Sequence, residues 1–275
     1  MLLAACLHAA WNALVKAGGD RLVVLACVNF TGVIVGAIGV ILLPLPAPEA
    51  WPYLIASAIF HTGYYFYLLN AYSKGDLVQV YPLARGSAPL LITFGGYLFA
   101  GENMGSLAVC GILLASFGIV SLSFERGWPF GKGNHAVSAA LITSLWIAAY
   151  SVTDGLGGRL AGNVLSYISW LAFIDGWPII LYTLYRRGAT LPRYFASHWR
   201  YCMTGGVFSL LAYGLIIYAM TMGAMGMISA LRETSVIIAA LIGVIILKER
   251  FTLIRVASVL MVAAGVILMH ATATA

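Results

Sequence analysis

Residues 77–100 read LVQVYPLARGSAPLLITFGGYLFA, a stretch whose only charged side chain is Arg85. A helix needs about 20 mostly apolar residues to cross a bilayer, and this stretch is long enough. Nine further stretches of the same character occur along the chain, which is 62% hydrophobic and 9% charged. The predicted spans are 2–17, 22–43, 51–73, 77–100, 105–123, 135–154, 163–185, 199–222, 225–247 and 252–270.

These spans predict an all-α integral membrane protein. In lipid every backbone polar group must be satisfied within the chain, which favours helices over open strands. The alternating segments of a membrane β-barrel, each about 10 residues long, do not occur in this sequence. The connections are short, the longest being 125–134 and 186–198, so the chain has no room for a soluble domain.

The net charge of +6 does not indicate a nucleic-acid-binding protein. The basic residues are scattered at span ends, where they set topology and meet anionic lipid. Cys6, Cys27, Cys110 and Cys202 lie inside spans without CxxC spacing, so we expect small packing residues and no metal or cofactor. The first apolar stretch lacks a basic leader and is expected to remain as the first helix.

The basic residues also predict an orientation. The odd-numbered loops hold twelve of them and the even-numbered loops hold only Arg159, while Arg85 and Arg232 lie within spans. The positive-inside rule therefore places the odd-numbered loops in the cytoplasm and both termini outside. The twelve are Lys16, Arg21, Lys74, Arg126, Lys132, Arg186, Arg187, Arg193, Arg200, Lys248, Arg250 and Arg255.

The second half of the chain repeats part of the first. At a shift of 148 residues, span 77–100 aligns with span 225–247, and one residue of slip extends the match into the last span. An odd number of spans per half inverts the second copy, an arrangement typical of secondary transporters. We predict a first repeat at 1–123, a connecting loop at 124–134 and an inverted repeat at 135–275. The aligned pairs are Tyr65–Tyr213, Ala71–Ala219, Gly75–Gly223, Leu83–Leu231, Ser87–Ser235, Gly95–Gly243, Glu102–Glu249, Leu113–Leu260 and Gly118–Gly265.

Short motifs near the span ends extend this pattern. They are Leu7-His8-Ala9-Ala10-Trp11-Asn12, Ala71-Tyr72-Ser73-Lys74-Gly75, Tyr81-Pro82, Pro89, Gly101-Glu102, Gly111 with Gly118, Tyr218-Ala219 and Leu247-Lys248-Glu249-Arg250. With these motifs the chain resembles the ten-helix EamA-type carriers of the drug/metabolite transporter superfamily, among them the YddG-like amino-acid exporters. The resemblance implies two inverted five-helix repeats around a central cavity, and export of small metabolites, often amino acids. Ser229 and Ile237 replace Tyr81 and Pro89 in the second half, so the cavity is expected to be asymmetric.

Three charged residues within spans are candidates for substrate binding or gating. Arg85 lies on one helix face with Tyr81 and Pro89, and an arginine holds a carboxylate through two parallel N–H bonds. Glu233 occupies the repeat position of Arg85, so the two can pair across the pseudo-twofold axis as a gate or latch. Adjacent helical residues point about 100° apart, so Arg232 is not expected to face the same spot as Glu233. The alternatives are a structural ion pair, snorkelling of Arg85 and local neutralisation of Arg232 by Glu233.

Aromatic and polar side chains supply the remaining substrate candidates. Aromatic rings with a polar tip suit an amphipathic ligand, including an ammonium group. Helix packing or an interfacial belt is the alternative. These candidates are His8, Trp11 and Asn12 in the first span, Tyr64 and Tyr65 in the third, Tyr81 in the fourth, Trp146, Tyr150 and Thr153 or Asp154 in the sixth, and Tyr213 in the eighth.

Two residues are candidates for ion coupling. Asp175 stands beside Gly176 and Pro178, which are expected to break the helix and free its carbonyls. His61 can titrate near neutral pH, although a membrane histidine is more often a satisfied hydrogen-bond partner.

The sequence thus predicts a secondary-active or facilitative exporter of small metabolites, most simply amino acids, in the inner membrane. It works by alternating access, as a monomer in the lipid bilayer, with protons as a candidate coupling ion. Export of cationic drugs and exchange of phosphorylated metabolites remain open. Rivals of another class are a membrane-embedded enzyme, which would need His8, His61 and Asp175 to converge, and a receptor or scaffold. The sequence has no nucleotide-binding or hydrolase motif.

Overall fold

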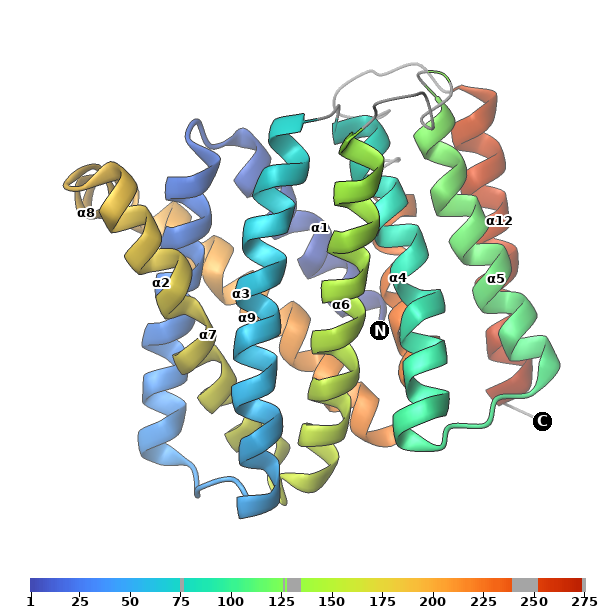
Figure 1. Cartoon of the computed structure of the whole chain (residues 1–275), viewed down its shortest axis with the longest axis horizontal. Coiled ribbons are helices and arrows are strands. Elements are labelled where there is room, and N and C mark those ends of the chain that lie inside the picture. Colours follow the sequence, from blue (N-terminus) through green and yellow to red (C-terminus); the bar gives the residue numbers. More distant parts are fainter. Residues whose placement is uncertain (75–76, 126, 128–134, 239–251, 274–275) are drawn as a thin grey trace. The chain divides into compact units, whose positions relative to one another are not determined.

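The computed structural model describes residues 1–74, 77–125, 127, 135–238 and 252–273. Every regular element in these ranges is a helix, which confirms the all-α prediction (Figure 1). Most predicted spans coincide with one helix. The helices are α1 (Leu2–Ala17), α2 (Arg21–Leu42), α3 (Trp51–Lys74), α4 (Leu77–Ala100), α5 (Ser106–Ser121), α6 (His135–Leu160), α7 (Val164–Arg187), α8 (Thr190–Ser197), α9 (Trp199–Met222), α10 (Met225–Arg232) and α12 (Leu253–Ala273).

The helices have the length and composition of membrane spans. Within the described residues, six helices are long and apolar enough to cross a bilayer. The last part of the predicted span 225–247, and the motif residues Lys248, Glu249 and Arg250, lie outside the described residues. The six helices are Arg21–Leu42, Ser106–Phe124, Val137–Leu160, Val164–Arg187, Trp199–Met220 and Leu253–Ala271.

The chain forms two compact units, and each unit draws on both sequence repeats. The first unit contains Met1, 3–62 and 153–222, and the second contains Leu2, 63–152 and 223–275. Helices α3 and α6 therefore pass from one unit to the other within their length. The contact-based division differs from the sequence-based one because helices of the two repeats interleave.

In the first unit, α2 packs backbone to backbone against α7. A Cβ built on Gly36 of α2 would lie 2.7 Å from the backbone oxygen of Ser169, and one on Gly176 of α7 would lie 3.1 Å from the backbone oxygen of Asn29. Small residues allow this approach in lipid, where no hydrophobic force drives two helices together. The two helices correspond to the second spans of the two predicted repeats.

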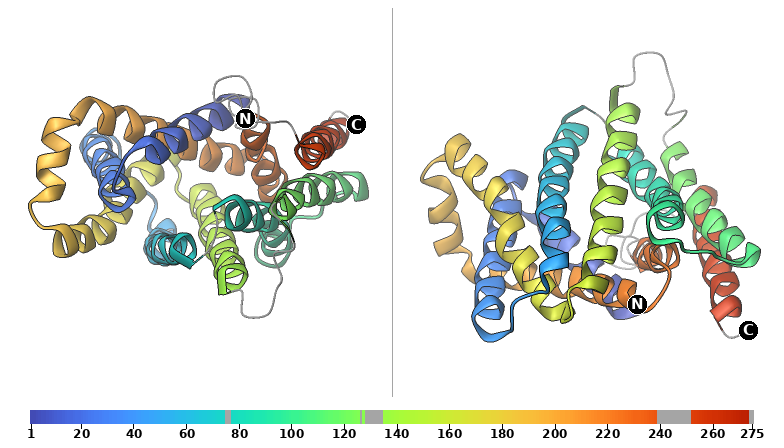
Figure 2. Two further views of the ribbon diagram at one scale, coloured as in Figure 1. Left: turned by 90° about the horizontal axis from the view of Figure 1, so that it is seen from above. Right: turned by 60° about the horizontal axis from the view of Figure 1, so that its bottom comes forward.

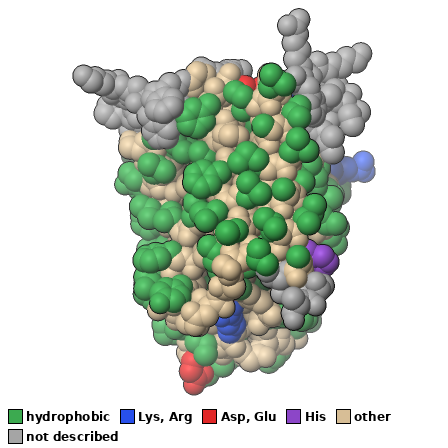
Figure 3. Space-filling view, turned by 90° about the vertical axis from the view of Figure 1, so that its right-hand side faces the viewer, with side chains coloured by type: hydrophobic (Ala, Val, Ile, Leu, Met, Phe, Trp, Pro, Cys, Tyr) green, Lys and Arg blue, Asp and Glu red, His purple; other side chains and the backbone are tan. Residues whose placement is uncertain are grey.

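In the second unit, α5 and α12 lie side by side in a similar way (Figure 2). A Cβ on Gly265 of α12 would lie 2.5 Å from the backbone oxygen of Gly111, so the two backbones touch. The outward face of these helices is largely hydrophobic (Figure 3), as a lipid-facing surface requires. Its exposed side chains include Leu107, Leu113, Phe117, Leu253, Leu260 and Ile267.

Within each unit, odd-numbered connections contact odd-numbered ones and even-numbered connections contact even-numbered ones. This is expected when successive spans run in alternating directions. In the first unit, Asp20 before α2 pairs with Arg187 at the end of α7, at 2.7 Å. In the second unit, Glu125 after α5 pairs with Arg255 of α12 at 3.0 Å. The even-numbered connections also meet within each unit, because the amide of Ala47 donates to the carbonyl of Ala161 at 3.1 Å and the amide of Met225 to a Glu102 carboxylate oxygen at 2.9 Å. Connections of equal parity therefore share an end of their unit.

The short helix α8 was not expected, because residues 186–198 were read as a plain connection. Only Leu191 of its eight residues is buried, while the ring of Phe195 packs edge-on against Phe30 of α2 at 5.1 Å. A helix with one narrow apolar face and a polar remainder suits the membrane interface. The signal is easily missed because eight residues give only two turns of periodicity.

Candidate functional site

Three charged side chains are buried together in the second unit. The guanidinium of Arg85 on α4 donates from Nη2 to Oε1 of Glu233 at 2.9 Å and from Nε to Oε2 at 3.1 Å. Arg232 donates from Nε to the same Oε1 at 3.2 Å. Arg85, Arg232 and Glu233 expose 4%, 1% and 0% of their surfaces, so Arg85 does not snorkel to the interface. We call these three residues the charged triad.

The triad lies at a break in the ninth predicted span. The sequence predicted one helix over 225–247, and this is wrong because α10 ends at Arg232. The amides of Glu233 and Thr234 bond three residues back, to the carbonyls of Ala230 and Leu231, and the Thr234 hydroxyl also donates to Leu231 at 2.8 Å. A threonine hydroxyl that competes for a helix carbonyl favours such an interruption. The helical conformation resumes at Ser235, so the span is discontinuous in the manner of transporter binding helices.

The expectation that Arg232 does not face the same spot as Glu233 is wrong, because Nε of Arg232 lies 3.2 Å from Oε1 of Glu233. Glu233 keeps a helical backbone, with φ −70° and ψ −5°, so the length of the two side chains brings the charged groups together. Its side chain reaches both guanidinium groups at once. A single carboxylate is thereby shared by two arginines, and the triad carries one net positive charge.

Two polar atoms beside the triad have no partner within the described part of the chain. They are Nη2 of Arg232 and Oγ of Ser229, one turn earlier on α10. Leaving a buried donor without an acceptor costs about 1–3 kcal/mol, and more when the donor is charged. An acceptor supplied by a bound molecule would recover this cost, so the triad has the chemistry of an anion site.

The aromatic candidates of the second unit surround Arg85. Tyr64, Tyr81 and Tyr150 all interact electrostatically with its guanidinium. The ring of Tyr64 lies 5.5 Å from the rings of both Tyr65 and Tyr150. The structure thus brings Tyr64, Tyr81 and Tyr150 near Arg85, and Tyr65 joins them through its contact with Tyr64.

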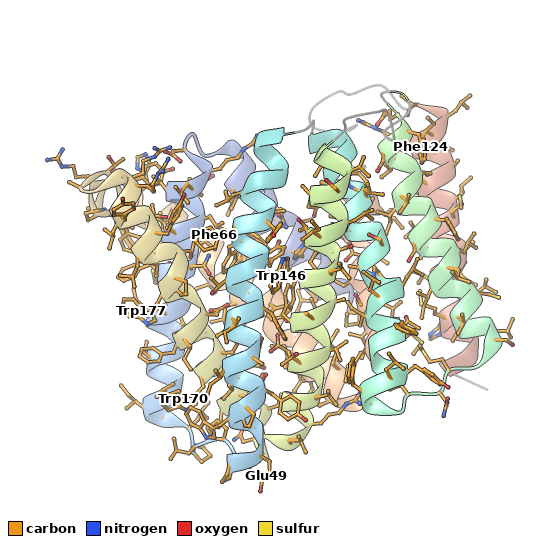
Figure 4. The ribbon with its side chains drawn as sticks, viewed as in Figure 1. Glu49, Phe66, Phe124, Trp146, Trp170 and Trp177 are labelled. Carbon is orange, nitrogen blue, oxygen red and sulfur yellow. The ribbon has the colours of Figure 1, made fainter. Side chains whose placement is uncertain are left out.

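Trp146 of α6 extends toward α3 in the same unit (Figure 4). A Cβ on Gly63 would lie 2.7 Å from its indole, so only glycine admits the ring at this point. Its indole also lies 6.0 Å from the ring of Tyr67. These contacts give Trp146 a packing role against α3, and a substrate contact remains a prediction.

The candidates on α1 contact one another within the first unit. Nε1 of Trp11 donates to Nδ1 of His8 at 3.2 Å, and Nδ2 of Asn12 donates to the carbonyl of His8 at 2.8 Å. All three side chains are half-buried. The predicted shared face is therefore present, with its polar groups already engaged along the helix.

A second buried polar cluster lies in the first unit, around Asp154 of α6. Tyr167 of α7 donates to its Oδ1 at 2.9 Å, Tyr213 of α9 donates to its Oδ2, and Ser57 of α3 also bonds to the carboxylate. His61 of α3 joins through Ser57 and lies edge-on to Tyr213, with ring centres 5.4 Å apart. We call these five residues the Asp154 cluster.

His61 and Tyr213 are among the candidates predicted from the sequence. Asp154 is predicted only as an alternative to Thr153 at the end of the polar stripe on span six. The available signal was its charge, since a carboxylate inside a span is rare without a function. The end of that span was set at 154, which left the residue at a boundary, whereas α6 continues to Leu160.

Asp175 does not occupy a helix break. Helix α7 runs from Val164 to Arg187 through Pro178, so the expected interruption is wrong. Gly176 serves instead as a contact point for α2. Asp175 itself is half-buried. Within the described residues no group of three or more His, Cys, Asp and Glu side chains could hold a metal ion.

Comparisons with known proteins agree with this architecture. Residues 135–271 match the model of the EamA-like transporter family. No curated protein matches the chain. Among 28 matching chains of solved structures, one described only as "Crystal structure of protein" superposes with a TM-score of 0.78 at 18% identity, covering 100% of this chain and 95% of its own. At that identity the similarity concerns the fold alone.

Proposed function

Since the chain belongs to the EamA-like transporter family, whose model matches its second half, it is a multi-pass membrane transporter of small molecules, and we propose that it exports metabolites bearing one carboxylate. Amino acids are the first candidates. The observation that supports this substrate class is the charged triad, with its net positive charge and an Nη2 of Arg232 that has no partner within the described residues.

The charge of the triad separates the candidate substrates. A monoanionic carboxylate would neutralise the single excess charge, and it suits an arginine fork geometrically. A phosphate monoester would bring close to two negative charges to one free guanidinium edge. An organic cation would need a free carboxylate, whereas Glu233 is engaged by two arginines. Carboxylate export is therefore preferred to drug export or phosphate exchange.

The tyrosines around Arg85 favour a zwitterion over a simple carboxylate. Their rings and hydroxyls offer a surface for an ammonium group close to the triad. In the proposed cycle the substrate carboxylate takes the free edge of Arg232, and Glu233 is then shared less tightly between the arginines. The discontinuous helix at 232–235 is the element that would change shape as access alternates.

The proposal includes a location. The protein would sit in the inner membrane as a monomer, with odd-numbered loops in the cytoplasm and both termini outside. The basic residues of those loops support this orientation.

The decisive test is counterflow in proteoliposomes with a panel of labelled amino acids. Wild type is expected to exchange at least one of them, and Arg232→Met is expected to lose exchange with folding intact. Arg187→Lys, a change at an exposed arginine, serves as the matched control. No exchange of any amino acid by wild type would reject the substrate class. Full exchange by Arg232→Met would reject the triad as the binding group.

A further inference from the structure

Asp154 is a fully buried carboxylate that the transport proposal leaves unused. Its exposed fraction is 0%, and it sits among side chains from three other helices of the first unit. Both of its oxygens accept hydrogen bonds, Oδ1 from Tyr167 and Oδ2 from Tyr213, and Ser57 supplies a further bond. Because four helices contribute to these hydrogen bonds, Asp154 occupies a preformed polar site inside the first unit.

No cation balances this carboxylate within the described residues. Lys, Arg and His side chains form no ion pair with Asp154 there. Arg159, on the same helix, is exposed and donates from Nε to the carbonyl of Met220 at 2.9 Å. The titratable groups facing Asp154 from its neighbours are His61 of α3, Tyr167 of α7 and Tyr213 of α9.

The hydrogen bonds fix which groups can donate. Nδ1 of His61 lies 3.0 Å from the carbonyl oxygen of Ser57, which can only accept, so this nitrogen carries a proton. The Ser57 hydroxyl, 3.1 Å from the same nitrogen, is then free to donate to Asp154. With this protonation of His61, the hydroxyl groups of Ser57, Tyr167 and Tyr213 all donate to the carboxylate of Asp154. His61 orients the Ser57 hydroxyl and acts on Asp154 only through it.

Two opposing effects therefore act on Asp154. Burial without a cation favours the neutral acid, because an ionised carboxylate loses its hydration. Three hydroxyl donors favour the carboxylate, because each hydrogen bond to it stabilises the charged form. A carboxyl group on which both effects act can exist in either protonation state, as reversible proton binding requires.

We propose that Asp154 is the proton-binding site that couples proton movement to transport, an inference that rests on the proposed transport function. Uptake forms one O–H bond on a carboxylate oxygen of Asp154 and leaves a neutral acid. Release breaks that bond and returns the proton to water on the other side of the membrane. The half-buried Tyr213, on Oδ2, is the member of the cluster nearest to solvent.

The first test separates coupling from binding. Counterflow needs no net proton movement, whereas accumulation driven by a pH gradient does. Asp154→Asn keeps the size of the side chain and is expected to retain counterflow while losing pH-driven accumulation. Asp20→Asn, the same change at a partly exposed carboxylate before α2, is the matched control and is expected to retain both.

The outcomes distinguish the two proposals. If wild type shows no counterflow, the substrate proposal has failed. The coupling proposal is then tested by the infrared measurement described below, which needs no substrate. If Asp154→Asn still accumulates substrate under a pH gradient, the coupling proposal is overturned. Accumulation by wild type under a sodium gradient with no response to pH would overturn it as well.

A substrate-independent readout keeps the inference testable. Infrared difference spectra of the purified protein, taken across a pH titration, are expected to show a carboxylic-acid carbonyl band that shifts in heavy water. Other carboxyl groups contribute to this band, so the signal of Asp154 is the difference between the titrations of wild type and Asp154→Asn. That difference is expected to contain one carboxylic-acid band that Asp20→Asn retains. Identical titrations of wild type and Asp154→Asn would refute the assignment.

If Asp154→Asn fails to fold, Tyr213→Phe replaces it. This variant removes one donor to the carboxylate and no charge. The pH midpoint of the infrared band is expected to move upward, because the ionised form has lost a hydrogen bond. An unchanged midpoint would contradict the proposal.

Discussion

Arg85 and Glu233 are 148 residues apart in sequence and joined by two hydrogen bonds of 2.9 and 3.1 Å. The predicted sequence repeat has the same offset of 148 residues, so Glu233 occupies the position that aligns with Arg85. The expected pairing across the repeat is therefore present in the structure. Arg232 adds a second positive charge to the carboxylate.

The triad predicts an asymmetry between its members. Glu233→Gln leaves two buried guanidinium groups without a counter-charge and is expected to cost about 3–5 kcal/mol of stability. Arg85→Met leaves one arginine with one glutamate, a neutral pair, and is expected to cost less. The double variant is expected to be more stable than Glu233→Gln alone. Thermal unfolding in detergent measures all three, and equal, additive losses would contradict the shared-carboxylate description.

Substitution of Ser229 distinguishes a role in substrate binding from a purely structural role of its hydroxyl. Its hydroxyl is buried without a partner in the described residues, so Ser229→Ala is expected to raise the stability of the empty protein by up to about 1–3 kcal/mol. If the substrate uses the hydroxyl, affinity falls by about two- to tenfold, the equivalent of one neutral hydrogen bond. Thermal shifts with and without substrate measure both effects. Loss of stability without substrate would show that the hydroxyl already has a partner.

Much of the fold is readable from the sequence because one physical requirement dominates. Every span must bury its backbone in its own helix, so apolar length alone locates α2, α5, α7, α9 and α12. The break at Arg232 was not readable, because it depends on a local competition between Thr234 and the helix carbonyls. Residues 232–235 read Arg-Glu-Thr-Ser, but residue type alone does not say whether the Thr234 hydroxyl bonds to a helix carbonyl.

The site was readable in part for a similar reason. Arg85 and Glu233 stand out because a charge in lipid is costly, and the repeat register pairs them. The Asp154 cluster depends on which faces of α3, α6, α7 and α9 meet, and sequence spacing does not contain that information. His61 was weighed as a lone histidine because its link to Asp154 runs through Ser57.

The glycine contact between α5 and α12 predicts a position-specific cost. Gly265→Ala would place a methyl group 2.5 Å from the Gly111 carbonyl oxygen, so the helices must separate, at about 1–3 kcal/mol. Gly32→Ala in α2 meets no atom within 4 Å and is expected to gain about 0.5–1 kcal/mol. Unfolding in detergent compares the two identical substitutions. Equal effects would argue against backbone contact at Gly265.

Asp20 has two roles that substitution can separate. Its Oδ1 caps α2 by accepting from the amides of Leu22 and Val23, while Oδ2 pairs with Arg187. Asp20→Asn keeps the cap and loses an ion pair whose side chains are 37% and 44% exposed, so the expected cost is below about 1 kcal/mol. Asp20→Ala also loses the cap, at about 1 kcal/mol more. Equal stability of the two variants would show that the cap contributes little.

The orientation is tested by two single cysteines in a background without Cys6, Cys27, Cys110 and Cys202. Ala196 on α8 and Asn103 before α5 are both exposed and lie in connections of opposite parity. Because nearly all basic loop residues share the parity of α8, a membrane-impermeant maleimide applied to intact cells is expected to label Asn103→Cys and spare Ala196→Cys. Inverted vesicles should give the reverse pattern, which controls for reactivity. Labelling of Ala196→Cys alone in intact cells would place both termini in the cytoplasm and turn the proposed direction of transport into an open question.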